Sequence, residues 1–271
     1  MHSMFPFSAR QILWTLTFAS QLVLLVVLLG RDRARRYPWF TVSIALFAFR
    51  LLIEDLLDGR MANLPFQEIL LGLADLGVIV GLVVVVEAAR RSFAGARRLT
   101  WLAGAFATVA LAAAALVFWF PWAQWKTIQW GTLLGTLRIM QFGAQAADIF
   151  VDLLTVELGL LVVLLGRQFR SGWRSHTQKL VIGLSTVSLA RLVVQVTGTL
   201  LSGAQVHSRA EYERLVSLWG RMLNANKVVF LVALIWWIVW LWMDEPAGIT
   251  ASSGVPQTLS DAALDTPQAV E

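Results

Sequence analysis

Long apolar stretches recur along the chain, and short polar segments separate them. A helix needs ~20 mainly apolar residues to cross a bilayer, and seven stretches meet that requirement. The pattern therefore predicts an all-α fold, a polytopic seven-transmembrane helix bundle. The predicted spans are Gln11–Gly30, Phe40–Leu57, Glu68–Ala89, Leu99–Phe120, Asp148–Gly166, Gln178–Leu201 and Leu223–Met243.

The composition is that of a membrane protein. Apolar residues make up 58% of the chain, charged residues 14%, and the mean hydropathy is +0.68, values far from those of soluble domains. We expect a transmembrane domain over residues 1–245. Residues 246–271 are acidic and rich in Ala, Ser, Thr and Pro, which predicts a disordered cytoplasmic tail. Cysteine is absent, so no disulfide or thiolate chemistry is expected.

Basic residues are concentrated in alternate loops. The first, third and fifth loops are rich in arginine, whereas the second and fourth hold only Arg60, Lys126 and Arg138. Because basic loops stay in the cytoplasm, we expect the N-terminus outside and the C-terminus inside, in a cell membrane such as the bacterial inner membrane. Contact with anionic lipid explains the basic loops, so we expect no nucleic-acid partner.

Charged and amide side chains interrupt the predicted spans, mostly from the midplane outward. Such side chains are costly in lipid, and they usually pair with one another or line a water-filled cavity. We therefore predict an outward-facing ligand pocket. Its residues are Arg50, Glu54, Asp55, Asp75, Gln145, Asp148, Asp152, Glu157, Arg191, Gln195, Asn224 and Lys227. The alternative is that these charges only hold neighbouring helices together.

Residue spacing groups several of these side chains on common helix faces. Three of them, Gln145, Asp148 and Asp152, follow one stripe of the fifth predicted helix together with Gln141. Glu157 lies roughly 140° around the same helix at 100° per residue, so we expect it to act as a ligand or proton group and not as part of the stripe. Arg50 and Glu54 are four residues apart and can pair. We also expect Arg50 or Arg191 to reach an acidic residue of another span.

The chain lacks motifs for catalysis and cofactor binding. G-x-S-x-G, H-E-x-x-H, P-loop and Gly-rich dinucleotide motifs are missing from the sequence, so we predict no enzyme. The three histidines lie outside the predicted spans, so we expect no histidine-ligated cofactor and no metal. Lys227 lies near the outer end of the last span and lacks the spacing of retinal-binding lysines.

Two short sequences occur twice in the chain. LLVVLLGR ends the first and fifth predicted helices, at Leu24–Arg31 and Leu160–Arg167, and the helices that follow contain TVSIA (Thr41–Ala45) and TVSLA (Thr186–Ala190). These matches suggest a 3+1+3 layout of two parallel repeats. The layout resembles the SWEET and PQ-loop carriers, whose parallel repeats enclose a central substrate site. Their Pro-Gln motif is missing, so the resemblance assigns no site residues.

Three functions agree with these features. A sensor- or receptor-like protein would bind a ligand in the pocket and signal through a protein partner or a homo-oligomer, since no output domain is visible. A structural or accessory subunit would use its apolar faces within a larger membrane complex. A carrier would use the charges to move a small solute or protons. We rank the functions in that order. We further expect the Trp-rich segment Pro121–Thr132 to anchor in the outer interface.

Overall fold

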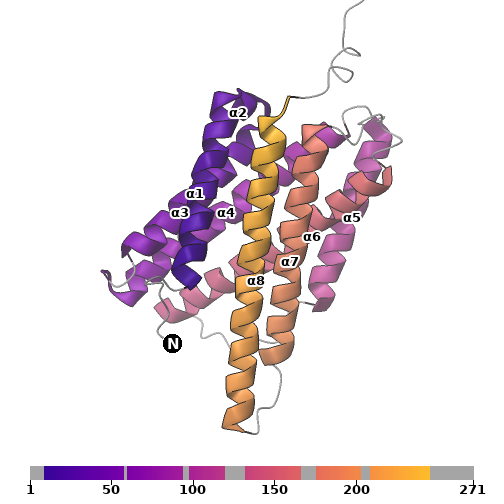
Figure 1. The fold of residues 1–271 in the computed structure, drawn as a ribbon. Coiled ribbons are helices and arrows are strands. Elements are labelled where there is room, and N and C mark those ends of the chain that lie inside the picture. The colour runs from indigo at the N-terminus through magenta and orange to yellow at the C-terminus, as the bar shows by residue number, and fades with distance from the viewer. Residues whose placement is uncertain are drawn as a thin grey trace, which may run out of the picture.

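The computed structural model describes residues 9–57, 60–93, 98–119, 132–165, 175–202 and 208–244. Within these ranges the chain forms eight helices and no strand, which confirms the predicted all-α fold (Figure 1). The predictions for the tail 246–271 and for the Trp-rich segment 121–131 lie outside the described residues.

Seven of the described helices are long, and each matches one predicted span to within one residue at the span's ends or extends beyond it. They are α1 (Ala9–Gly30), α3 (Pro38–Leu57), α4 (Asn63–Ser92), α5 (Arg98–Trp119), α6 (Leu133–Leu165), α7 (His176–Ser202) and α8 (Arg209–Trp242). The short helix α2 (Arg33–Arg36) lies between α1 and α3.

Among the described helices, four are long and apolar enough to cross a membrane, over Gln11–Gly30, Pro65–Ser92, His176–Leu201 and Arg209–Trp242. α3 and α6 have 20 and 33 residues, but charged residues interrupt the apolar part of each. The described side chains of α5 cover a shorter apolar stretch, Gly104–Phe118. Membrane crossing by α3, α5 and α6 therefore stays a prediction.

α6 and α8 begin about four turns before the spans predicted for them. Hydrophobicity alone could not place these starts, because polar and charged residues interrupt the apolar pattern in the added turns. Capping does so. The Ser208 hydroxyl accepts the backbone N–H of Glu211 at 3.2 Å, and the Thr132 hydroxyl accepts that of Gly135 at 3.0 Å. Each cap satisfies an N–H that has no partner inside the helix and so fixes where the helix begins.

Six of the long helices form a closed ring that follows the order of the chain. α1 packs on α3, α3 on α4, α4 on α6, α6 on α7 and α7 on α8, and α8 returns to α1. α5 packs against α6 at the side of the bundle (Figure 1). Neighbours in the ring come from both ends of the chain, so the bundle is one body and not two separate halves.

Contacts between helix ends bring the arginine-rich segments to one end of the bundle. Arg31 follows α1 and pairs at 3.1 Å with Asp244, which follows α8. The Tyr37 hydroxyl, at the start of α3, lies 2.9 Å from the Thr177 hydroxyl at the start of α7. The guanidinium of Arg91, near the end of α4, lies 5.2 Å from the centre of the Tyr37 ring. We call this end of the bundle the basic end.

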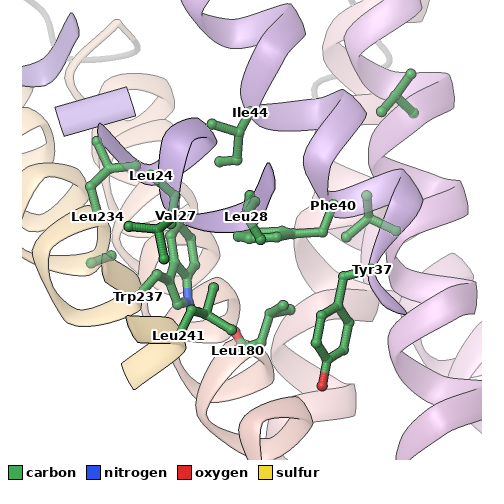
Figure 2. Packing of buried hydrophobic residues seen from close by; sticks show 13 residues of the cluster. Leu24, Val27, Leu28, Tyr37, Phe40, Ile44, Leu180, Leu234, Trp237 and Leu241 are labelled. Atoms are coloured by element: carbon green, nitrogen blue, oxygen red, sulfur yellow. The ribbon is translucent and has the colours of Figure 1, made fainter. Parts of the chain in front are cut away.

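An apolar core fills the half of the bundle next to the basic end (Figure 2). It contains residues of α1, α3, α4, α7 and α8, among them Leu24, Val27, Leu28, Phe40, Ile44, Val80, Val84, Leu180, Leu234, Trp237 and Leu241. The rings of Phe40 and Trp237 meet edge to face with centroids 5.1 Å apart. The core thus occupies the half of the bundle next to the basic end.

The indole of Trp237 holds α8 against α7 within this core. Its Nε1–H donates to the carbonyl oxygen of Leu180 at 3.3 Å, which satisfies the one polar atom of a buried ring. Gly183 provides the space for the indole, because a Cβ at that position would overlap the ring. Glycine is therefore needed here for close approach and not for its backbone freedom.

Candidate ligand-binding site

The structure places six of the predicted site residues in two groups, both away from the basic end. Three line a cavity between α1, α3 and α8: Arg50, Glu54 and Lys227. Three form ion pairs between α6 and α7: Asp148, Asp152 and Arg191. The two groups lie on different parts of the helix ring, so the described residues do not form the single pocket that the sequence suggested.

The cavity between α1, α3 and α8 has a volume of about 280 Å³, near the lower limit of small-molecule pockets. On α1 and α3 the lining residues recur every three or four positions, which places them on one face of each helix. The lining consists of Leu13, Trp14, Thr17, Gln21, Phe47, Arg50, Leu51, Glu54, Lys227 and Phe230.

The apolar core closes this cavity on the side of the basic end. α1 and α8 run toward the basic end and α3 runs away from it, so Gln21, Phe47 and Phe230 are the deepest lining residues. Core residues lie one turn beyond them on the same three helices (Figure 2): Leu24, Ile44 and Leu234. Glu54 and Lys227 are exposed on the opposite side, so the cavity opens away from the basic end.

The Thr17 hydroxyl of the cavity donates to the Leu13 carbonyl oxygen at 2.7 Å, whereas Gln21 Oε1 and the two cations of the lining lack partners within the described chain. Gln21 is only 1% exposed, and its Oε1 accepts no hydrogen bond from a described residue. Arg50 and Lys227 form no ion pair in the described ranges, and the predicted pair between Arg50 and Glu54 is not made. An exposed ion pair of this kind stabilises a protein by only ~0.3–0.5 kcal/mol. Hydration of the Glu54 carboxylate is therefore about as favourable as the ion pair. A polar ligand would satisfy these groups.

Gln21 and the aromatic residues of the cavity were not predicted as site residues. Gln21 is the one amide side chain in the apolar run Ile12–Gly30, and that isolation was the available signal. Trp14, Phe47 and Phe230 carry no such signal, because apolar residues at helical spacing are expected in any span. Only the packing of α1 and α3 with α8, which is distant in sequence, shows which of these residues face a cavity.

The second group is a network of charged and polar side chains between α6 and α7. Arg191 lies 3.1 Å from Asp148 through Nη2 and 3.4 Å from Asp152 through Nε. The Ser188 hydroxyl donates to Asp152 Oδ1 at 2.8 Å. Asp152 is 1% exposed, and its Oδ2 has the ion pair with Arg191 but no hydrogen bond among the described residues. The contact between Arg191 and Asp152 confirms the expectation that an arginine of one span reaches an acid of another.

Small residues allow α6 and α7 to approach closely beside this network. A Cβ on Gly159 would overlap the Ser185 hydroxyl, and that oxygen lies 2.8 Å from the carbonyl oxygens of both Thr155 and Val181. Small and hydroxyl-bearing residues at such contacts let helix backbones pack tightly. The short α6–α7 distance explains why a side chain of α7 reaches two carboxylates of α6.

The remaining predicted residues belong to neither group: Asp55, Asp75, Gln145, Glu157, Gln195 and Asn224. Glu157 is partly buried, and its Oε2 has no hydrogen-bond partner among the described residues. Asp75 lies on the same face of α4 as the exposed Ile79 and Leu82, so it points away from both groups. Their part in ligand binding stays a prediction.

Within the described ranges no three His, Cys, Asp or Glu side chains gather as a metal site would require. Comparisons of the chain with protein families, with curated proteins and with solved structures give no match. The functional argument therefore depends on the geometry of the site.

The ion pairs of Arg191 give the first testable prediction. Arg191→Gln leaves a buried carboxylate without its cation, a change that costs ~3–5 kcal/mol in buried pairs. Because a third of Arg191 is exposed, we expect about 3 kcal/mol and a lower midpoint of thermal unfolding. Adding Asp152→Asn should restore most of the loss. Arg209→Gln breaks the exposed pair with Glu213 and should cost less than ~1 kcal/mol. Equal losses in the two variants would contradict the prediction.

Two glutamates of the long helices should respond differently to the same substitution. Glu157→Gln removes a carboxylate that has no described partner, so stability should be unchanged or higher. Glu87→Gln weakens bonds from the Arg91 guanidinium at 3.1 Å and the Trp39 backbone N–H at 3.2 Å, and we expect a loss of roughly 1–3 kcal/mol. Thermal unfolding of both variants tests this. A large loss for Glu157→Gln, reversed by removing an arginine, would make Glu157 a structural residue.

Proposed function

We propose that the protein is a seven-span membrane protein that binds a small molecule between α1, α3 and α8 and acts as a sensor or receptor through a partner. The unpaired polar lining of the cavity is the observation that carries this proposal. Charges that serve only to join helices are paired, as Asp148, Asp152 and Arg191 are. Gln21, Arg50 and Lys227 have no such partners, and a bound ligand would supply them.

The surroundings of the charged residues support seven spans. In α3, Arg50 and Glu54 line the cavity; in α6, Asp148 and Asp152 contact Arg191. Charges in these positions do not have to face lipid. Each of α3 and α6 is at least about 30 Å long at 1.5 Å per residue, enough for the hydrocarbon core of a bilayer. α5 then returns the chain between α4 and α6.

The basic end gives the orientation of this proposal. Arginine-rich ends stay in the cytoplasm and contact anionic lipid, so the cavity opens to the outside of a cell membrane such as a bacterial inner membrane. Ligand binding would connect α1, α3 and α8 in the half of the bundle that the core does not hold together. A partner protein, or a second copy of the chain, that binds one arrangement of these helices more tightly would respond to ligand binding.

A carrier is the second candidate, and one observation favours it. The segments QLVLLVVLLGR (Gln21–Arg31) and ELGLLVVLLGR (Glu157–Arg167) differ only at their first and third positions. They make Gln21 equivalent to Glu157, and each has a buried oxygen without a described partner. If the two repeats are superimposed around the ring, the contact between α4 and α6 corresponds to the contact between α8 and α1. Uptake of a ligand into proteoliposomes, lost in Glu157→Gln, would favour the carrier over the sensor.

Because the chain contains no cysteine, single cysteines test the orientation directly. Arg35→Cys and Arg209→Cys replace side chains that are 87% and 92% exposed, at opposite ends of the bundle. In intact cells an impermeant maleimide should label Arg209→Cys alone, and after lysis it should label both. Labelling of Arg35→Cys in intact cells would reverse the proposed orientation.

Filling the cavity tests ligand binding. Thr17→Trp places an indole among the lining residues, whereas Thr15→Trp places one on the exposed side of the same helix. In a thermal-shift screen with a library of small molecules, compounds that stabilise the wild type should also stabilise Thr15→Trp and should not affect Thr17→Trp. If no compound separates the two variants, the cavity is not the binding site.

A further inference from the structure

The lining of the cavity specifies the chemical class of its ligand. Resting on the proposed function, we infer that the ligand is a small organic anion with an aromatic or apolar body and a hydroxyl or similar polar group at its far end. Three features of the cavity support this class: its charge, its apolar walls and the amide at its deep end.

The charge of the lining favours an anion. Arg50 and Lys227 bring two positive charges and Glu54 one negative charge, so the lining is net positive. Arg50 lies about one turn deeper than Glu54 and forms no ion pair in the described ranges. A guanidinium presents its N–H groups as a fork that matches a carboxylate or phosphate. We therefore place the anionic group of the ligand at Arg50, with Lys227 beside the opening.

Apart from its polar residues, the lining of the cavity is apolar and largely aromatic. Phe47 and Phe230 approach each other edge to face with ring centroids 6.2 Å apart, and Trp14 and Leu51 complete the sides. Aromatic side chains at such spacing pack well against another ring. The body of the ligand that follows its anionic group is therefore apolar, and a ring suits it best.

The Gln21 amide lies at the deep end, beside the apolar core. It is 1% exposed and its Oε1 has no described partner. A buried amide left unpaired costs ~1–3 kcal/mol, so a ligand group that bonds it gains affinity. A hydroxyl can donate to the amide oxygen or accept from the amide nitrogen, so it suits either orientation of the side chain. The far end of the ligand should carry such a group.

The anion could come from a free metabolite or from the headgroup of a lipid, because both offer a carboxylate or phosphate to Arg50. The shared chemistry is an anion at Arg50 with an apolar body toward Phe47. The cavity is small and closed by the core, which favours a free molecule of modest size. The experiment therefore needs separate conditions with and without anionic lipid.

Isothermal titration of the full chain in detergent, without added lipid, tests the class with three probes of similar size. 4-Hydroxyphenylacetate has all three features, phenylacetate lacks the hydroxyl, and tyramine carries an ammonium in place of the carboxylate. We expect the Kd of 4-hydroxyphenylacetate to be at least tenfold lower than that of either other probe. Tighter binding of tyramine, or no binding of any probe, would overturn the inference.

Variants then link each feature to its residue. Gln21→Leu should raise the Kd of 4-hydroxyphenylacetate about tenfold, or ~1.4 kcal/mol, and leave that of phenylacetate unchanged. Arg50→Gln should weaken both carboxylates at least tenfold and spare tyramine. Arg221→Gln removes an exposed arginine of α8 outside the lining and should change neither. Equal effects of Arg50→Gln and Arg221→Gln would overturn the inference.

Nanodiscs of phosphatidylcholine or of phosphatidylglycerol separate the two sources of the anion. A free anion should bind equally in both. If phosphatidylglycerol blocks the probe, and stays bound to the wild type but not to Arg50→Gln in native mass spectrometry, a lipid headgroup is the ligand and the free anion is ruled out. The proposed function fails separately: it falls only if Thr17→Trp and Thr15→Trp respond alike to every compound of the library.

Discussion

An ionised side chain inside an apolar helix bundle must be paired, hydrated or bound to a ligand, because burying it alone costs several kcal/mol. The bundle meets this constraint in two ways. Between α6 and α7, Arg191 forms an ion pair with the buried Asp152, and the Ser188 hydroxyl donates to Asp152 Oδ1. Between α1, α3 and α8, Gln21, Arg50 and Lys227 line a cavity; Gln21 Oε1 has no hydrogen-bond partner, and the two cations form no ion pair, among the described residues. This difference is why we propose a structural role for the first group and a binding role for the second.

The place of the cavity follows from the place of the apolar core. Near the basic end, α1, α3 and α8 pack together through Leu24, Ile44 and Leu234. One turn farther from that end, the same helices line the cavity with Gln21, Phe47 and Phe230. A half held together by the core and a half with a cavity on the same helices suit a binding protein. The core keeps the helices in register, and a ligand can adjust their spacing where the core ends.

The sequence was sufficient to predict the helices but not their partners. The apolar runs placed the long helices, since each run is long enough to exclude other structures. The polar first turns of α8 were missed, because the capping pair Ser208 and Glu211 has no hydrophobic signature. The stripe with Asp148 and Asp152 was visible from spacing alone. The separation of Arg50 from Arg191 was not, because it depends on which helices are neighbours in the ring.

A cryo-electron microscopy map of the full chain in lipid nanodiscs tests the central claim most directly. We predict seven spans and density that belongs to no protein atom between α1, α3 and α8, within hydrogen-bonding distance of Arg50 and Gln21. Density at this place would show that a ligand satisfies the unpaired groups. A closed gap in which Arg50 pairs with Glu54, and the Gln21 amide bonds to a neighbouring helix, would show that the helices satisfy these groups themselves, and it would contradict the claim.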